Sequence, residues 1–287
     1  MITKTDSDFS GLRSFLWPIH RHEIKKVIPM TIMLVLICLN YSILRNLKDI
    51  VVVTAQSSGA EVIPFIKVWV MLPMAFLTTY LFTKLNNWFS QDRVFFIIIS
   101  SFLLFYVLFV FFLYPARDII HPHEFAQWMG TFLPKGFRGL VAMVENWSFT
   151  LFYVMCELWG TIVLTVLFWG FANEVTKIGE SRRFYSVMGI GSNIAAAIAG
   201  QLSNFLMVDQ FSASLPYGTD AWEQSMINIV LALSLFGFIT IALFWWMNKN
   251  VLNEENYETL HTTIPKPKKK KLSLSESFSY LSQSKYL

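Results

Sequence analysis

The sequence is poor in charged residues, and this scarcity decides the class of protein. Only 15% of its 287 residues are charged, whereas 54% are hydrophobic and 27 are phenylalanine. A typical soluble domain carries about 25% charged residues, and the mean hydropathy of this chain is +0.48. The composition therefore excludes a soluble globular domain and predicts a protein that lies in a lipid bilayer.

Cysteine is almost absent as well. The two cysteines, Cys38 and Cys156, both lie inside apolar runs. Such a pair offers neither a disulfide framework nor a CxxC motif for metal or redox chemistry. The compartment therefore has to be inferred from the distribution of charge along the chain.

The common signatures of nucleotide-hydrolysing and metal-dependent enzymes are also missing. The chain has no Walker A motif, so any nucleotide it handles is not hydrolysed by the P-loop route. The string GIGSN at 189–193 begins like a dinucleotide-binding loop, but Ile194 stands where a third glycine is needed, and we interpret it as a small-residue helix face. His121, His123 and Glu124 have no further His or Cys ligand beside them and are interpreted as a polar loop. No metal site and no cofactor are predicted.

Long apolar runs are what the sequence has in abundance. A hydrocarbon core of about 30 Å needs about 20 apolar residues in helical form. Six runs approach or exceed this length: Val27–Leu44, Val62–Phe82, Val94–Tyr114, Trp147–Asn173, Phe184–Val208 and Met226–Met247. The sequence therefore predicts an all-α integral membrane protein in which six transmembrane helices occupy residues 27–247.

Positive charge is distributed unevenly between the two sides of the predicted bundle. Short cytoplasmic connections carry an excess of Lys and Arg, and most of the 23 Lys and Arg residues fall on the side that holds both termini. Residues 1–26 and 248–287 are therefore predicted to be cytoplasmic, and 115–146 to be a long outer loop. Basic runs such as Lys268–Lys271 also occur in nuclear signals and lipid-binding patches. We interpret this one as part of a solvated linker, so no nucleic-acid partner is predicted.

Two charged residues interrupt the apolar runs. A charge at the bilayer centre costs about 2.5–3.5 kcal/mol, so it usually faces protein or water. Glu157 lies near the middle of the fourth run, and its alternatives are a functional carboxylate or a structural hydrogen bond or ion pair. Lys67 lies nearer the outer end of the second run, from which its side chain could also reach the interface. Pro64 and Pro73 flank it and free backbone groups that only a protein interior or a water-filled cavity satisfies. An interrupted helix with a cation is typical of a wall that binds an anion.

A denser charged cluster follows the first run. The string ILRNLKDIVVV contains Arg45, Lys48 and Asp49, which this reasoning places at the first outer turn. One alternative is a plain exposed turn. The other is that the two cations help to bind an anion, because cations on the outer side run against the topological bias.

Several strings resemble the ATP/ADP translocase family of plastids and obligate intracellular bacteria, the non-mitochondrial nucleotide transporter family. They are LRSFLWPIHRHEIKKVIPM, NYSILRNLKDIVVVTA, GAEVIPFIKVWVMLP and FYVMCELWGTIVLTVLFWGFANEVTKIGESRRFY. The resemblance implies one half of a major-facilitator-type transporter of twelve helices. Residues 248–287 would then be a basic linker towards a second half.

The resemblance also implies a function and site residues. It implies a transporter rather than an enzyme, most simply one that exchanges ATP for ADP across the inner membrane of an intracellular bacterium, without a cofactor. Family members use a membrane lysine and a membrane glutamate, which correspond here to Lys67 in PFIKVWV and Glu157 in CELWG. The resemblance implies that the partners of this chain are ATP, ADP or other nucleotides, the lipid bilayer, and the second half of the transporter. That second half would come from the same gene or from another copy.

The first turn departs from the family pattern. Asn46 and Leu47 replace the acid and threonine of the commoner string LRDTKD. This leaves open the nucleotide and the coupling ion, so proton-coupled import of nucleotides or NAD is an alternative to exchange. A six-helix membrane scaffold that transports nothing is a second alternative. Plastid members carry transit peptides, and the acidic N-terminal segment does not resemble one, which favours a bacterial member.

Overall fold

The computed structural model describes residues 18–252, and within this range every regular element is a helix. The predicted all-α class is therefore confirmed. Most of the predicted N-terminal segment and almost all of the predicted basic linker, including Lys268–Lys271, lie outside the described residues.

Five helical runs in the described part are long and apolar enough to cross a membrane. They are α2 (Ile24–Val53), α3 (Val62–Phe65) with η1 (Ile66–Met71) and α4 (Leu72–Trp88), α5 (Gln91–Leu108) with η2 (Phe109–Leu113), α9 (Trp147–Leu158) with η4 (Trp159–Phe168) and α10 (Trp169–Val175), and α12 (Ala221–Asn250). Each contains one of the runs predicted from the sequence, except that the third run extends one residue further, to Tyr114. The elements η1, η2 and η4 are π-helices inserted into otherwise α-helical spans.

The predicted fifth span, Phe184–Val208, falls in α11 (Ile178–Leu206) except for its last two residues, and this helix of 29 residues is not among the five. Charged residues in its first turns and its many Gly and Ser residues lower its hydropathy. The count of six spans therefore stays a prediction. The small-residue face is as expected, because a Cβ atom built on Gly191 would lie 3.1 Å from both Thr31 and Val35 of α2. The absence of a side chain lets the two helices approach closely.

The first helix is longer than the sequence reasoning predicted. It continues through Arg45, Lys48 and Asp49 to Val53, so these residues lie in the last turns of α2 and not in an outer turn. The prediction was wrong because it ended the helix at the first charge. Lys48 is buried against carboxylates, so its charge is compensated without leaving the helix.

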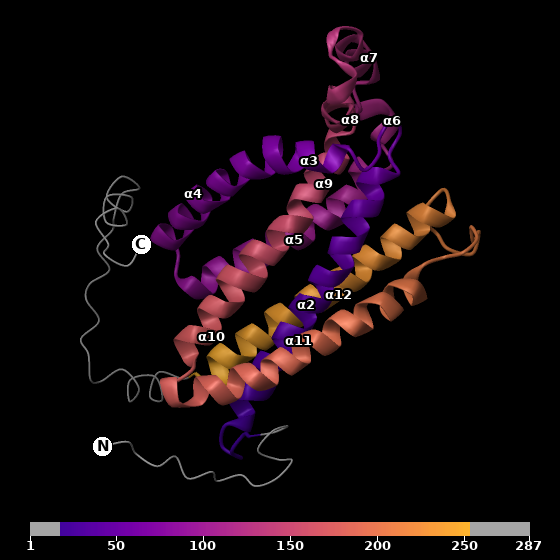
Figure 1. The fold of residues 1–287 in the computed structure, drawn as a ribbon. Coiled ribbons are helices and arrows are strands. Elements are labelled where there is room, and N and C mark those ends of the chain that lie inside the picture. Colours follow the sequence, from indigo (N-terminus) through magenta and orange to yellow (C-terminus); the bar gives the residue numbers. More distant parts are fainter. Residues whose placement is uncertain (1–17, 253–287) are drawn as a thin grey trace, which may run out of the picture.

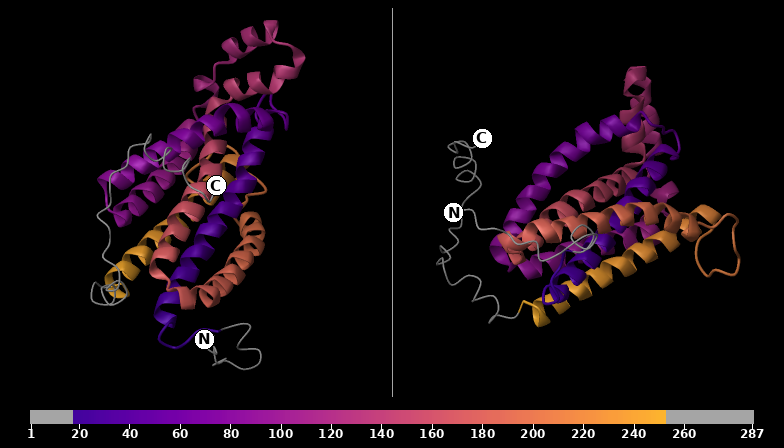
Figure 2. Two further views of the ribbon diagram at one scale, coloured as in Figure 1. Left: turned by 60° about the vertical axis from the view of Figure 1, so that its left-hand side comes forward. Right: turned by 60° about the horizontal axis from the view of Figure 1, so that its bottom comes forward.

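The bundle is arranged around α2, which packs against α9, α11 and α12 (Figures 1 and 2). Stacked aromatic rings join α5 and η2 to two of these helices. The Phe95 ring of α5 lies 3.8 Å from that of Phe244 on α12, and the Phe109 ring lies 4.2 Å from that of Phe152 on α9. In contrast, α4 buries none of its residues fully, and large apolar side chains such as Phe76, Leu77 and Leu81 are exposed on it.

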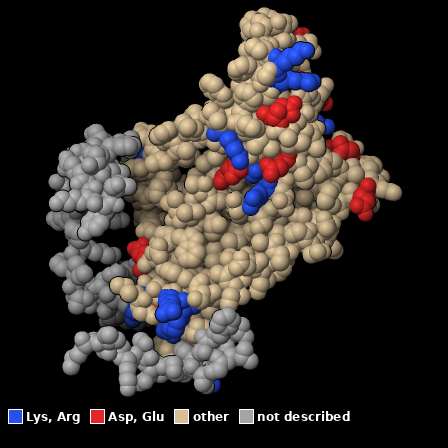
Figure 3. Space-filling view, viewed as in Figure 1, with Lys and Arg blue, Asp and Glu red and all other residues tan. Residues whose placement is uncertain are grey.

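A short helical hairpin projects beyond one end of the bundle (Figures 1 and 2). It consists of α6 (Arg117–Ile120), α7 (His123–Phe132), η3 (Lys135–Phe137) and α8 (Arg138–Glu145). We call residues 117–145 the cap; the sequence had predicted only a loop there. The cap is seated on α3, since a Cβ atom on Gly139 would lie 2.5 Å from the Glu61 carbonyl oxygen. Charged side chains gather on the cap and just below it, whereas much of the bundle surface is uncharged (Figure 3).

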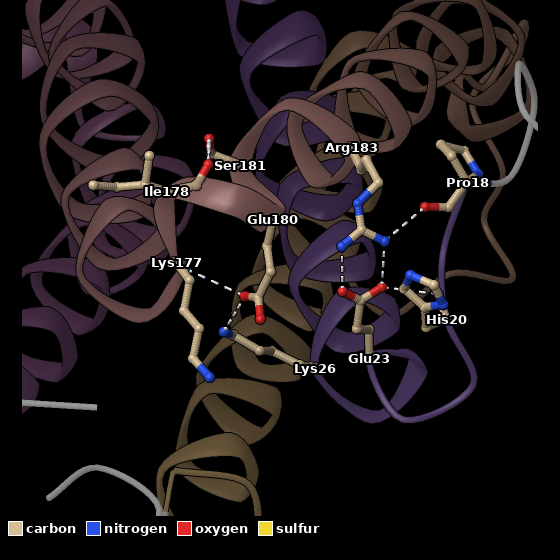
Figure 4. Close-up of polar contacts among 9 residues, drawn as sticks. All are labelled: Pro18, His20, Glu23, Lys26, Lys177, Ile178, Glu180, Ser181 and Arg183. Atoms are coloured by element: carbon tan, nitrogen blue, oxygen red, sulfur yellow. Dashed lines mark hydrogen bonds and ion pairs between the residues drawn. The ribbon is translucent and has the colours of Figure 1, made fainter. Parts of the chain in front are cut away.

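At the opposite end, ion pairs join the beginnings of α2 and α11 (Figure 4). Arg183 donates to both Glu23 oxygens, at 2.6 and 2.8 Å, and to the Pro18 carbonyl oxygen at 3.1 Å. Lys26 donates to Glu180 at 2.9 Å. Burial raises the pKa of Glu23, but the hydrogen bonds and charge of Arg183 outweigh it, so this pKa lies below its ordinary value of 4.5.

Replacing Glu23 with glutamine is expected to lower the free energy of unfolding at neutral pH by about 2 kcal/mol, the usual range for hydrogen bonds to a charged group. Because the pKa of Glu23 is lowered by folding, its contribution is complete above the unfolded-state pKa. It is lost as the pH falls through the folded-state value. Thermal unfolding of the detergent-purified protein between pH 7 and pH 3 measures this. The E23Q variant should lose less stability on acidification than the wild type, while exposed Glu174→Gln should behave as wild type. Parallel pH profiles for all three proteins would contradict it.

Candidate functional site

Lys48 forms the centre of a charged cluster between α2 and α9. Its Nζ atom lies 2.6 Å from Asp49 Oδ1 and 3.1 Å from Glu157 Oε1. The same atom lies 4.0 Å from the centre of the Tyr153 ring, a cation–π distance. The Lys48 side chain is only 4% exposed, so its charge is held almost entirely by these three groups.

The contact between α2 and α9 explains why these groups meet. Tyr153 and Glu157 are separated by one helical turn and so share a face of α9. Further along, the Trp159 indole donates to the Ile37 carbonyl oxygen at 3.3 Å. Gly160 faces Tyr41, whose ring would lie 2.5 Å from an added Cβ atom. These contacts hold the helices close enough for Glu157 to reach Lys48.

The cluster has more negative than positive charge. One ammonium group faces two carboxylates, and a buried cation needs such partners to compensate its lost hydration. The carboxylates are not equally enclosed: Glu157 is 27% exposed and Asp49 is 48% exposed. Since an ammonium group donates up to three hydrogen bonds, an incoming phosphate could replace a carboxylate at Lys48. The arrangement can therefore exchange one anionic partner for another.

Lys67 lies elsewhere, in the π-helix η1. Pro64 lies in α3 just before η1, and Pro73 lies in the first turn of α4 just after it. Within residues 18–252, the Lys67 side chain is exposed and makes no ion pair. Segment η1 nevertheless packs beside α9, the helix that bears Glu157. Short π-helical segments occur frequently at functional sites.

Arg45 lies one turn before Lys48 on α2 and is exposed. The structure thus brings together Lys48, Asp49 and Glu157 among the predicted site residues. It leaves Arg45 and Lys67 outside this contact. In the described part of the chain, the ion-pair partner of Glu157 is Lys48.

Sequence reasoning missed Tyr153. Its spacing of four residues from Glu157 was a usable signal, because residues so spaced share one face of a helix. The π-helix η4, which begins two residues after Glu157, had no comparable signal, since its sequence WGTIVLTVLF contains no proline.

The histidines of the cap are engaged in ordinary polar contacts. His121 Nε2 lies 2.7 Å from Ser148 Oγ, and His123 Nδ1 lies 2.9 Å from Glu145 Oε1. Burial and the neighbouring His123 lower the pKa of His121. No group of three or more metal-binding side chains occurs in residues 18–252.

Charged residues inside a bundle of apolar helices are rare, and they often mark the pathway of a transported substrate or ion. A sequence profile of the TLC ATP/ADP transporter family matches residues 2–287. The chain belongs to this family. It is therefore a transporter-family membrane protein and not an enzyme.

Similar proteins occur in Chlamydia and Rickettsia and in plant chloroplasts. ADP,ATP carrier protein 1 of Chlamydia trachomatis is 44% identical over 287 residues, which is all of this chain and 54% of the relative. ADP,ATP carrier protein 1 of Rickettsia bellii is 37% identical over 99% of this chain and 56% of the relative. The chloroplastic ADP,ATP carrier protein 1 of Arabidopsis thaliana is 39% identical over 92% of this chain and 41% of the relative. The chain thus spans about half the length of these curated relatives. No solved structure matches it significantly.

Proposed function

We propose that this chain is the N-terminal half of a carrier that exchanges ATP for ADP across the inner membrane of an intracellular bacterium. Membership of the TLC ATP/ADP transporter family supports this, as do the names of its relatives. The observation that carries the proposal to particular residues is the buried Lys48 held between Asp49 and Glu157.

Exchange of anionic partners is the central step of the proposed mechanism. In the empty carrier, Lys48 is neutralised by the two carboxylates. An entering phosphate group displaces Glu157, the carboxylate that comes from another helix, and takes its place on the ammonium group. Breaking this contact loosens α9 from α2 and so couples nucleotide binding to helix movement. Arg45 and Lys67, which are exposed, bind further phosphate oxygens.

The remaining parts of the carrier follow from the same proposal. A second half, from the same gene or another copy, closes the central path against this bundle. Both termini of this chain lie in the cytoplasm, and the cap lies outside. Concentration gradients of the nucleotides drive exchange, so no cofactor is required.

Uptake of radiolabelled ATP by cells that express the complete reading frame tests the proposal. Cells preloaded with ADP should take up ATP faster than cells without it, because exchange requires a counter-substrate. Complete failure to take up any nucleotide, with the protein present in the membrane, would contradict the proposed function.

Proton-coupled import of nucleotides or NAD is the second candidate. It is favoured by the partial exposure of Glu157 and by Asn46 and Leu47 in place of the common acid and threonine. Under this mechanism, uptake needs no preloaded nucleotide and stops when the proton gradient is collapsed. A scaffold that transports nothing would show neither behaviour.

Replacing Lys67 with alanine is expected to reduce nucleotide uptake by about tenfold or more, because one charge-assisted phosphate contact is lost. Membrane insertion should not suffer, since removing a cation from an apolar run eases insertion. Uptake per amount of membrane-inserted protein measures the effect. Lys84→Ala, which removes an exposed cation near the other end of the same span, is the matched control. Wild-type uptake in K67A would leave Lys67 as an interfacial side chain.

A further inference from the structure

A cavity of about 910 Å³ lies between the cap and the turn that connects α2 to α3. It is separate from the Lys48 cluster and none of its lining residues belongs to that cluster. Its walls come from α7, α8, the hairpin turn between them, Asp118 of α6, and Gln56 and Ser57 of the α2–α3 turn.

The two cap helices contribute to this cavity in a regular way. The lining residues of α7 are His123, Ala126, Gln127 and Gly130, and those of α8 are Arg138, Val141, Ala142 and Glu145. Both sets have the spacing of a single helix face. Polar residues stand at the ends of the α8 stripe and small apolar residues in its middle. At Gly130 there is no atom within 4 Å of the position that a Cβ atom would occupy, so the glycine adds open space.

The charges are separated along the cavity. Lys135 and Arg138 lie at the hairpin turn, and Glu145 lies at the other end of α8, about 10 Å away at 1.5 Å per residue. Glu145 is 9% exposed and contacts His123 at 2.9 Å. Asp118 adds a second acid to the cavity lining. Lys135 and Arg138 are exposed and form no ion pair within residues 18–252.

The walls are fixed before any ligand arrives. Gly139 seats α8 directly on the Glu61 backbone, and Asn146 donates to the Gln56 carbonyl oxygen at 3.0 Å. Ser57 has a positive φ of 58°, which is uncommon for a residue other than glycine. Such conformations persist where surrounding contacts enforce them, and they cluster at functional sites.

We propose that this cavity is a docking site for a nucleotide outside the central transport path. The phosphate groups bind Lys135 and Arg138, and the base lies against the small apolar middle of the two helices. Amino or hydroxyl hydrogens at the far end of the nucleotide donate to Glu145 or Asp118. The proposal rests on the proposed nucleotide exchange, and it adds a receiving site that raises the local concentration of substrate at the outer face.

Transport kinetics of the double variant Lys135→Ala/Arg138→Ala test the site. The apparent KM for external ATP should rise about tenfold, since two steering cations are lost. The maximal rate and the KM for internal ADP should stay unchanged, because the Lys48 cluster is intact. Uptake by the variant should also depend less on salt. Arg182→Ala, which removes an exposed cation at the opposite end of the bundle, should leave both KM values unchanged. An unchanged external KM in the double variant would overturn the site.

Photolabelling with 8-azido-ATP gives a readout that does not depend on transport. The purified wild-type protein should carry label on the peptide that spans residues 123–145, and the double variant should lose this label. Absence of cap label in the wild type, with normal exchange, would overturn the docking site alone. Cap label in a protein that transports no nucleotide would overturn the proposed exchange while leaving the site in place.

Discussion

Replacing Lys48 with alanine is expected to lower nucleotide exchange by at least about 100-fold, the range measured when one partner of a buried, hydrogen-bonded charge pair is truncated. Lys48 is the cation that both carboxylates contact, and alanine leaves no ammonium group at this position to bind a phosphate. Here Asp49 and Glu157 would be left without their shared cation, and the proposed phosphate contact would be lost with it. Initial rates of ATP uptake in ADP-preloaded cells, normalised to membrane-inserted protein, measure the loss.

Two further variants separate a transport defect from a folding defect. Lys48→Met combined with Glu157→Gln removes charge from both helices and should restore membrane-inserted protein without restoring exchange. Lys25→Ala removes an exposed cation from the beginning of the same helix and should behave as wild type. Exchange at the wild-type rate in K48A would contradict a role for Lys48 in binding phosphate.

Glu157→Gln is expected to reduce nucleotide exchange by about tenfold or more. The pH dependence of exchange should differ little from that of the wild type. The neutral amide keeps the shape of a protonated carboxyl group but cannot balance the charge of Lys48 at 3.1 Å. In the proposed mechanism this carboxylate competes with the phosphate for Lys48, so its loss leaves the phosphate without a competitor and slows the release of bound nucleotide. Exchange and pH-driven net uptake have to be measured separately.

Asp49→Asn provides the comparison for Glu157. Asp49 is the more exposed of the two carboxylates and comes from the same helix as Lys48, so its neutralisation should cost less exchange. If Glu157→Gln loses proton-driven uptake but exchanges nucleotides at the wild-type rate, Glu157 is a proton-coupling site instead. Wild-type behaviour in both assays would leave it with neither role.

The helical spans could be predicted because their signal is local. An apolar run of about 20 residues has few alternatives to a transmembrane helix, and five such runs are present as long helices. Their ends were harder to predict. The charges at Arg45 and Lys48 indicated the end of the first span, yet α2 continues to Val53 because its buried cation meets carboxylates. Similarly, nothing in residues 115–146 predicted the paired helices of the cap.

By itself, the sequence determined that this is a helical membrane protein, and its strings placed it correctly among the ATP/ADP translocases. It also singled out the charged residues that a bilayer would not tolerate without a partner. Only the tertiary structure decided which charges meet, pairing Glu157 with Lys48 and leaving Lys67 exposed. The reason is geometric. Hydrophobicity depends on each residue alone, whereas an ion pair depends on the rotation and depth of two helices. An inserted π-helix shifts both, and η4 does so without a proline to signal it in the sequence.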